Sequence, residues 1–167
     1  MRLVAQRVTR GVVRALEEGV WRTVGQVPMS SATIGAAGSG AAMGLVVLVC
    51  AMKGDGPADA DRLAARLAGY RIFADAEGRT NLAATDVGAG ALVVSQFTLA
   101  ADGKKGRRPS FDQAAPPAEA RALYERFCSA LSAAGVPVET GSFGAEMEVE
   151  LIGAGPATYL LEEPKGA

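Results

Sequence analysis

A short polar motif follows a buried apolar segment in the middle of the chain. Residues 91–94 are Ala-Leu-Val-Val, and Ser95-Gln96-Phe97-Thr98 comes directly after them. The motif offers two hydroxyls, an amide and successive backbone N–H groups where a strand leaves its sheet, and such donors can bind a carbonyl or an oxyanion. The simpler alternative is that Ser95 and Thr98 only satisfy backbone groups at the strand end.

The absence of histidine excludes several kinds of catalytic site. The chain cannot form a Ser-His-Asp or Cys-His arrangement, a histidine-ligated zinc site or a histidine proton shuttle. A nucleophilic Thr98 would need another base. Cys50 and Cys128 lie far apart without neighbouring metal ligands, so we predict two buried thiols, a reducing compartment and no metal. Gly38-Ser39-Gly40 precedes a strand, whereas a dinucleotide-binding loop follows a strand and opens a helix. We therefore expect no cofactor.

Hydrophobic spacing predicts a mixed α/β fold. Leu63 and Leu67 indicate an amphipathic helix over residues 59–68, and helical spacing closed by a glycine predicts a second helix over residues 117–134. Apolar alternation and buried runs predict strands at residues 1–13 (turning near 9–11), 20–27, 45–51, 71–73 and 91–94. A final β-hairpin is predicted with arms at residues 138–140 with 145–152 and at 158–161, joined at 153–156.

Length and charge place limits on organisation and location. A chain of 167 residues suits one domain over residues 1–167, in which residues 28–44, rich in Gly, Ala and Ser, form an insertion or long hairpin. Arginines near the start interrupt any apolar signal-peptide core, which predicts a cytoplasmic protein. The uncharged stretch 23–52 contains only a short strongly apolar part, whereas a membrane span needs about 20 apolar residues, so we expect no membrane partner.

Six spaced motifs together cover nearly the whole chain. They are Gln6-Arg7-Val8, residues 70–75, residues 93–99, residues 106–111, residues 140–143 with Met147, and Gly155-Pro156 with Thr158. In this order they resemble the D-aminoacyl-tRNA deacylases, formerly called D-tyrosyl-tRNA deacylases. The resemblance implies a homodimeric α/β fold with a β-barrel-like sheet and flanking helices. It also implies metal-free hydrolysis of the ester that links a D-amino acid, or achiral glycine, to the 3′ end of tRNA.

The same resemblance implies roles for individual residues. Ser95, Gln96, Phe97 and Thr98 would form the catalytic pocket for the terminal adenosine and the aminoacyl ester. Gly155 and Pro156, joined by a cis peptide bond, would reach into the partner subunit's site and exclude L-amino acids, while Arg7 would hold that loop in place. Backbone N–H groups near Phe97 and Thr98 would stabilise the oxyanion, with protons carried by water and the ribose 2′-hydroxyl; Thr98 as a covalent nucleophile is the alternative mechanism.

A basic segment follows the polar motif. Positive charge gathers at Lys104, Lys105, Arg107 and Arg108, although the formal net charge of the chain is −1. Phosphate contacts need only a local patch, so together with the resemblance this segment predicts contact with the tRNA acceptor end. The alternative is an ordinary solvated loop.

Two departures from the family pattern keep other functions open. Gly153 stands where the family's second motif has asparagine, and Ala157 stands where it has valine. The Gly-, Ala- and Ser-rich segment between Trp21 and Gly44 is also longer than the tight hairpin typical of the family. A repurposed paralogue acting on a small molecule and a non-catalytic RNA-binding homologue therefore remain as alternative functions.

Overall fold

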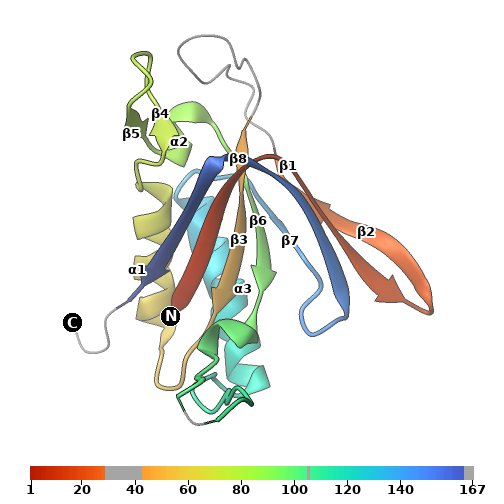
Figure 1. The fold of residues 1–167 in the computed structure, drawn as a ribbon. Coiled ribbons are helices and arrows are strands. Elements are labelled where there is room, and N and C mark those ends of the chain that lie inside the picture. The colour runs from red at the N-terminus through yellow and green to blue at the C-terminus, as the bar shows by residue number, and fades with distance from the viewer. Residues whose placement is uncertain (29–42, 105, 164–167) are drawn as a thin grey trace.

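The computed structural model describes residues 1–28, 43–104 and 106–163, and Figure 1 shows a strongly curved sheet with helices on one side. Lys105 and most of the predicted insertion at 28–44 lie outside the described residues. In chain order the elements are β1 (Arg2–Glu17), β2 (Val20–Gln26), β3 (Gly44–Cys50), α1 (Pro57–Ala68), β4 (Phe73–Ala74), β5 (Thr80–Leu82), α2 (Ala84–Val87), β6 (Ala91–Ser95), the 3-10 helix η1 (Phe97–Ala100), α3 (Pro117–Ala133), β7 (Val138–Thr140) and β8 (Met147–Glu162).

The main sheet is organised around the long strand β1. One edge of β1 pairs antiparallel with β8 over most of its length. The other edge pairs with β3 through its first half and with β2 through its second half. Beyond β3, β6 and β7 follow in parallel, with α1 in the connection before β6 and α3 in the connection before β7. Parallel neighbours require such long crossover connections, usually helical ones.

The helices cover one face of this sheet and form the larger core with it. Figure 1 shows α1 and α3 lying against the same side of the strands. Leu63 and Leu67 from α1 and Phe127 and Leu131 from α3 are almost fully buried in this core. The predicted spacing of Leu63 and Leu67 on one helix face is therefore confirmed, although α1 begins at Pro57, two residues earlier than expected.

The opposite, concave face holds a smaller core made mainly of valine. Val8, Val13 and Val46 are fully buried there beside Leu92. At the open side of the curve β2 approaches β7, and the backbone N–H of Gln26 donates to a carboxylate oxygen of Glu139 at 2.8 Å. The sheet is thus nearly closed, and the expected β-barrel-like α/β fold with flanking helices is confirmed.

The predicted turn near residues 9–11 is wrong, because β1 continues without reversing to Glu17. Gly11 is needed for packing rather than for turning: a Cβ atom there would lie 2.5 Å from a Val27 methyl group. The chain reverses instead at Glu18 and Gly19, which both have positive φ angles, and β2 then runs back from Val20. Two central residues with positive φ are typical of a tight hairpin whose twist matches the strands.

The predicted C-terminal hairpin is also wrong. β8 is a single strand, and the segments on both sides of residues 154–157 pair with β1 in the same antiparallel direction. Gln6 pairs with Thr158 whereas Val8 pairs with Gly153, so residues 154–157 bulge out of the ladder. Pro156 has no N–H to donate, which suits it to such a bulge. The short strand predicted as part of the first arm is β7, which pairs with β6.

The remaining differences concern short elements and one thiol. The strand expected at residues 71–73 begins only at Phe73, and β5 and α2 carried no sequence signal that we used. Both cysteines are free thiols; Cys50 is buried as expected, whereas Cys128 is only partly buried.

Within the described ranges, none of the helices has the length and apolar character that a membrane-spanning helix needs.

Candidate active site

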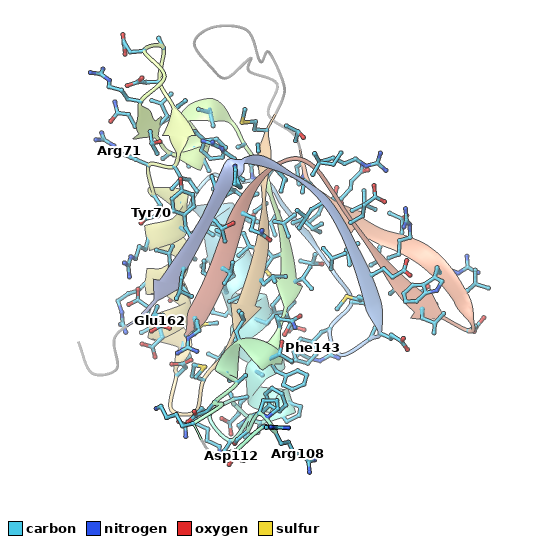
Figure 2. All side chains as sticks on the ribbon, viewed as in Figure 1. Tyr70, Arg71, Arg108, Asp112, Phe143 and Glu162 are labelled. Carbon is cyan, nitrogen blue, oxygen red and sulfur yellow. The ribbon has the colours of Figure 1, made fainter. Side chains whose placement is uncertain are left out.

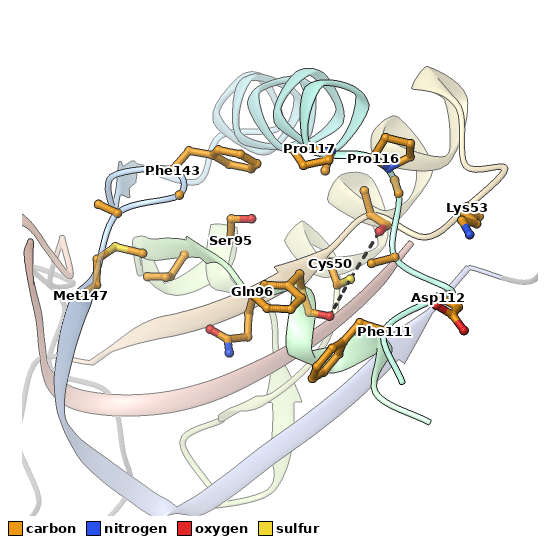
Figure 3. Close-up of a pocket in the computed structure, with 18 of the residues that line it drawn as sticks. Cys50, Lys53, Ser95, Gln96, Phe111, Asp112, Pro116, Pro117, Phe143 and Met147 are labelled. Atoms are coloured by element: carbon orange, nitrogen blue, oxygen red, sulfur yellow. Dashed lines mark hydrogen bonds between the residues drawn. The ribbon is translucent and has the colours of Figure 1, made fainter. Parts of the chain in front are cut away.

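A pocket of about 720 Å³ opens at the C-terminal ends of β3 and β6. Figure 3 shows the side chains that surround it, which come from both strand ends, the loop before α3, the start of α3, the β7–β8 connection and the start of β8. The residues that line it are Cys50, Ala51, Lys53, Val94, Ser95, Gln96, Phe97, Phe111, Asp112, Ala114, Ala115, Pro116, Pro117, Ala120, Phe143, Gly144, Ala145, Met147 and Val149. The carboxyl edge of neighbouring parallel strands is a common place for ligand sites in α/β proteins.

The position of the polar motif is set by β6, whose two faces are both buried. Ala91 to Val94 are buried, and the chain leaves the sheet at Ser95. The backbone N–H of Gln96 still donates to the carbonyl of Val49 on β3 at 2.8 Å, after which the chain turns into η1. Three of the four candidate catalytic residues, Ser95, Gln96 and Phe97, line the pocket.

Thr98 lies beside the pocket rather than in its lining. Its side chain is exposed, and its hydroxyl oxygen accepts a hydrogen bond from the amide of Gln96. Phe97 and Thr98 are the first two residues of η1, and the first N–H groups of a helix have no acceptor within that helix. These two N–H groups are therefore the backbone donors that η1 can offer to a bound oxygen.

Aromatic side chains lie on two sides of the pocket (Figure 3). The rings of Phe97 and Phe111 meet edge to face with centroids 5.1 Å apart, and Phe97 is 58% exposed. Phe143 lies across the pocket from Phe111, with the guanidinium of Arg121 4.8 Å above its ring. The exposed ring of Phe97 can stack on a planar group such as a nucleobase.

Phe111 and Phe143 are site residues that the sequence analysis missed. Both occur within the quoted family motifs, so the signal was present but was not read as part of the site. Cys50 was interpreted only as a buried thiol, yet it also lines the pocket.

The Cys50 thiol contacts the carbonyl of Phe97, with Sγ and O separated by 3.7 Å. Burial raises the pKa of this thiol, and the nearby positive charge of Arg2 opposes that rise only in part. The thiol is thus protonated at neutral pH and is a weak hydrogen-bond donor within reach of the carbonyls of Ala51 and Phe97, rather than a nucleophile.

The Gly155-Pro156 bulge lies away from the pocket in the same chain. Arg7 lies opposite the bulge and donates from Nε to the carbonyl of Ala154 at 3.2 Å and from Nη1 to the carbonyl of Ile72 at 2.9 Å. The Gly155-Pro156 peptide bond is cis, and both residues are exposed. Arg7 is in register with the start of β3, whereas the pocket begins at the other end of that strand, which at about 3.3 Å per residue is roughly 16 Å away.

The family of the chain follows from sequence comparison. Residues 4–162 match the D-Tyr-tRNA(Tyr) deacylase family. The chain belongs to this family. A D-aminoacyl-tRNA deacylase of Ruegeria pomeroyi is 59% identical over 119 residues, 71% of this chain and 82% of that protein. A D-aminoacyl-tRNA deacylase of Dinoroseobacter shibae is 49% identical over 162 residues, 97% of this chain and 99% of that protein.

Solved structures show the same fold as this member of the deacylase family. The c-Myc DNA unwinding element binding protein superposes with a TM-score of 0.80 at 28% identity, covering 98% of this chain and 99% of that one. A probable eukaryotic D-amino acid tRNA deacylase superposes with a TM-score of 0.70 at 17% identity, covering 96% and 97% of the two chains, and this second likeness concerns the fold alone.

The basic loop of this deacylase-family chain follows η1 and lies at the pocket end of the molecule. Lys104, Arg107 and Arg108 are exposed, and Figure 2 shows Arg108 at the same end as Phe143. Asp102 and Ser110 exchange backbone hydrogen bonds of 2.8 and 2.9 Å, which fix the base of the loop. The described part of the loop therefore presents its cations beside the pocket.

Among the described residues of this family member, no group of three or more His, Cys, Asp or Glu side chains is placed to hold a metal ion.

Proposed function

We propose that this protein hydrolyses the ester bond of D-aminoacyl-tRNA, and of glycine wrongly attached to tRNA, releasing the free amino acid and tRNA. The observation that carries this proposal is the pocket at the ends of β3 and β6, lined by Ser95, Gln96 and Phe97, in a chain that belongs to the deacylase family. The relatives at 49% and 59% identity are named D-aminoacyl-tRNA deacylases. A tRNA substrate favours a location in the cytoplasm.

The residues that line the pocket suit the terminal adenosine with its attached amino acid. The aromatic side chains of the pocket, Phe97 with Phe111 on one side and Phe143 on the other, would take the adenine base by stacking. The ester would then lie near the start of η1, where the N–H groups of Phe97 and Thr98 could donate to the oxyanion that forms when the carbonyl is attacked.

The chemical step that we propose uses water and the substrate's own ribose. A water oxygen attacks the ester carbon, the bond between that carbon and the ribose 3′ oxygen breaks, and the 3′ oxygen takes a proton. With no histidine in the chain, the ribose 2′-hydroxyl and water are the groups that relay this proton. The hydroxyl of Thr98 contacts an amide, which is not a base, and this favours the water mechanism over a Thr98 nucleophile.

Rejection of L-amino acids is assigned to the Gly155-Pro156 bulge of a second subunit. In one chain the exposed bulge and the pocket lie at opposite ends of β3, so the bulge would serve a pocket only in another copy. Arg7 supports the bulge through the carbonyl of Ala154, as expected for a residue that holds this loop in place. We therefore propose a homodimer in which each bulge closes the partner's site.

The basic loop is proposed to contact the phosphates of the tRNA acceptor end. Replacing Arg107 and Arg108 together by alanine should raise KM for the charged tRNA and reduce the dependence of KM on salt, since each lost phosphate contact lowers the salt slope by about one. Arg22→Ala, at an exposed arginine on β2, is the control. Equal salt slopes for the wild type, the double variant and Arg22→Ala would show that the loop does not contact the tRNA.

One assay tests the proposed function against its alternatives. The purified protein is mixed with D-tyrosyl-tRNA or with L-tyrosyl-tRNA, and release of tyrosine is followed over time. Selective release of D-tyrosine is the expected result. Binding of tRNA without turnover of either substrate would instead identify a non-catalytic RNA-binding homologue, and neither binding nor turnover would leave a paralogue that acts on a small molecule.

A further inference from the structure

Arg2, at the start of β1, reaches the far end of η1. Its Nη1 donates a hydrogen bond of 2.6 Å to the carbonyl of Leu99, which is 97 residues away in the sequence. Leu99 lies in the last turn of η1, where helix carbonyls lack partners within the helix. The Arg2 side chain is only 32% exposed, so this charged hydrogen bond is partly shielded from water.

The guanidinium of Arg2 is itself held in place by a residue of the sheet. Its Nε forms an ion pair with a carboxylate oxygen of Glu162 on β8, at a distance of 2.5 Å. The N–H group of Nε does not point at that oxygen, so the contact is not a hydrogen bond. Arg2 pairs in register with Glu162 on one side and with Cys50 on the other. A residue whose backbone pairs with both neighbouring strands, and whose guanidinium meets the carboxylate of Glu162, can define the position of the group that its Nη1 contacts.

The side chains of Cys50 and Arg2 both connect η1 to the sheet. Near its start, the N–H of Gln96 binds Val49, and the thiol of Cys50 lies against the carbonyl of Phe97. At its end, Arg2 donates to the carbonyl of Leu99, and the backbone of Ala100 forms a hydrogen bond with the Cys50 thiol. Because η1 has a single turn, a shift at its end would also tilt the N–H groups at its start.

We propose that Arg2 is a positioning residue for the deacylation reaction: by holding the carbonyl of Leu99, it orients the N–H groups of Phe97 and Thr98 toward the reacting ester. This inference rests on the proposed function. Arg2 lies outside the pocket lining and would act only through η1. Phe111 and Phe143, two of the three aromatic residues that line the pocket, lie outside η1, so binding of the substrate should depend less on Arg2 than turnover does.

The kinetic test replaces Arg2 by methionine, which keeps much of the side-chain volume and removes the donors and the charge. The values of kcat and KM are measured with D-tyrosyl-tRNA. We expect Arg2→Met to lower kcat by about tenfold to a hundredfold, the range for a hydrogen bond to a charged group, while KM changes by less than about threefold. Arg2→Lys keeps a charged donor and should recover most of the lost kcat.

Arg66→Met is the matched control. Arg66, on α1, also donates from Nη1 to a backbone carbonyl, that of Glu162, at 2.9 Å, and it does not touch η1. It should leave kcat unchanged. A kcat for Arg2→Met equal to that of the wild type, or an equal loss in Arg66→Met, would overturn the proposal.

Amide hydrogen exchange over residues 97–101 of the free protein provides a readout that does not depend on activity. Arg2→Met should accelerate exchange there, whereas Arg66→Met should not, and unchanged exchange in Arg2→Met would overturn the proposal. If the wild type does not release D-tyrosine, the proposed function fails while this measurement still tests the positioning of η1. If Arg2→Met does not fold, Glu162→Gln replaces it; faster exchange over the same residues supports the proposal and wild-type exchange overturns it.

Discussion

At the scale of single residues, the site depends on backbone groups that short side-chain contacts hold in place. The amide of Gln96 binds the hydroxyl of Thr98, and the thiol of Cys50 lies against the carbonyl of Phe97. Both contacts fix η1 rather than provide a base or a nucleophile. The chemistry is therefore expected to tolerate the loss of a side chain better than a displacement of η1.

Thr98→Ala tests this expectation directly, because alanine removes the hydroxyl but keeps the backbone N–H. We expect single-turnover deacylation of D-tyrosyl-tRNA to remain within about tenfold of the wild-type rate, since removing a true nucleophile costs about 10⁶ in kcat in the protease example. Thr98→Ser, which retains the hydroxyl, is the control. A fall approaching that size in a folded variant that still binds tRNA would restore Thr98 as the nucleophile.

At the scale of secondary-structure elements, one ion pair joins the two helices that cover the sheet. Arg126 on α3 donates two hydrogen bonds of 2.7 Å to the carboxylate of Asp61 on α1. The hydrogen bonds from Arg126 lower the pKa of Asp61 below its ordinary value of 3.8. The pair thus stabilises the fold above pH 3.8, and this contribution is lost as the pH falls through the lowered pKa of the folded state.

Asp61→Asn should make this pH dependence visible. At pH 7 the variant should unfold at a slightly lower temperature than the wild type, a small effect because the pair is exposed to solvent. At a pH below the folded-state pKa of Asp61 the two proteins should unfold at the same temperature. Thermal unfolding followed by circular dichroism from pH 2 to pH 7 checks this, with Glu125→Gln on the outer face of α3 as the control; a constant difference at every pH would refute it.

At the scale of the whole molecule, close contact between β2 and β7 nearly closes the barrel. A Cβ atom on Gly25 would lie 2.5 Å from the carbonyl oxygen of Thr140 on β7. We therefore expect Gly25→Ala to force the two strands apart and lower the free energy of unfolding by about 1–3 kcal/mol, as overpacking commonly does. Chemical denaturation measures this change.

Gly153→Ala is the matched control for that experiment. A Cβ atom there would meet nothing within 4 Å, so its free energy of unfolding should stay within about 0.5 kcal/mol of the wild type. Equal stability of Gly25→Ala and the wild type would contradict the close contact between β2 and β7.

The separation of the Gly155-Pro156 bulge from the pocket leads to a prediction about assembly. If the bulge completes a second subunit's site, the protein should have twice the monomer mass in solution. Light scattering at micromolar concentration measures this mass. A monomer that still releases only D-tyrosine would show that another part of the same chain rejects the L-amino acid.

The sequence by itself determined the local elements and the motif that ends β6. Leu63 and Leu67 repeat at helical spacing, residues 91–94 form a buried apolar run, and Ser95 marks the point where polarity begins; each signal lies within a few neighbouring residues. Turn chemistry was less reliable, because glycine serves packing as well as turning. Gly11 lies inside the barrel against Val27, and Gly155 lies in a bulge rather than in a hairpin.

Only the tertiary structure decided which distant segments meet. Phe111 and Phe143 join Phe97 in one pocket because the loop before α3 and the β7–β8 connection return to the same end of the sheet. Arg2 reaches Leu99 because β1 lies beside β3, which lies beside β6. Local spacing carries no record of such pairings, since they follow from burying apolar surface on both faces of one curved sheet, a property of the whole chain rather than of any segment.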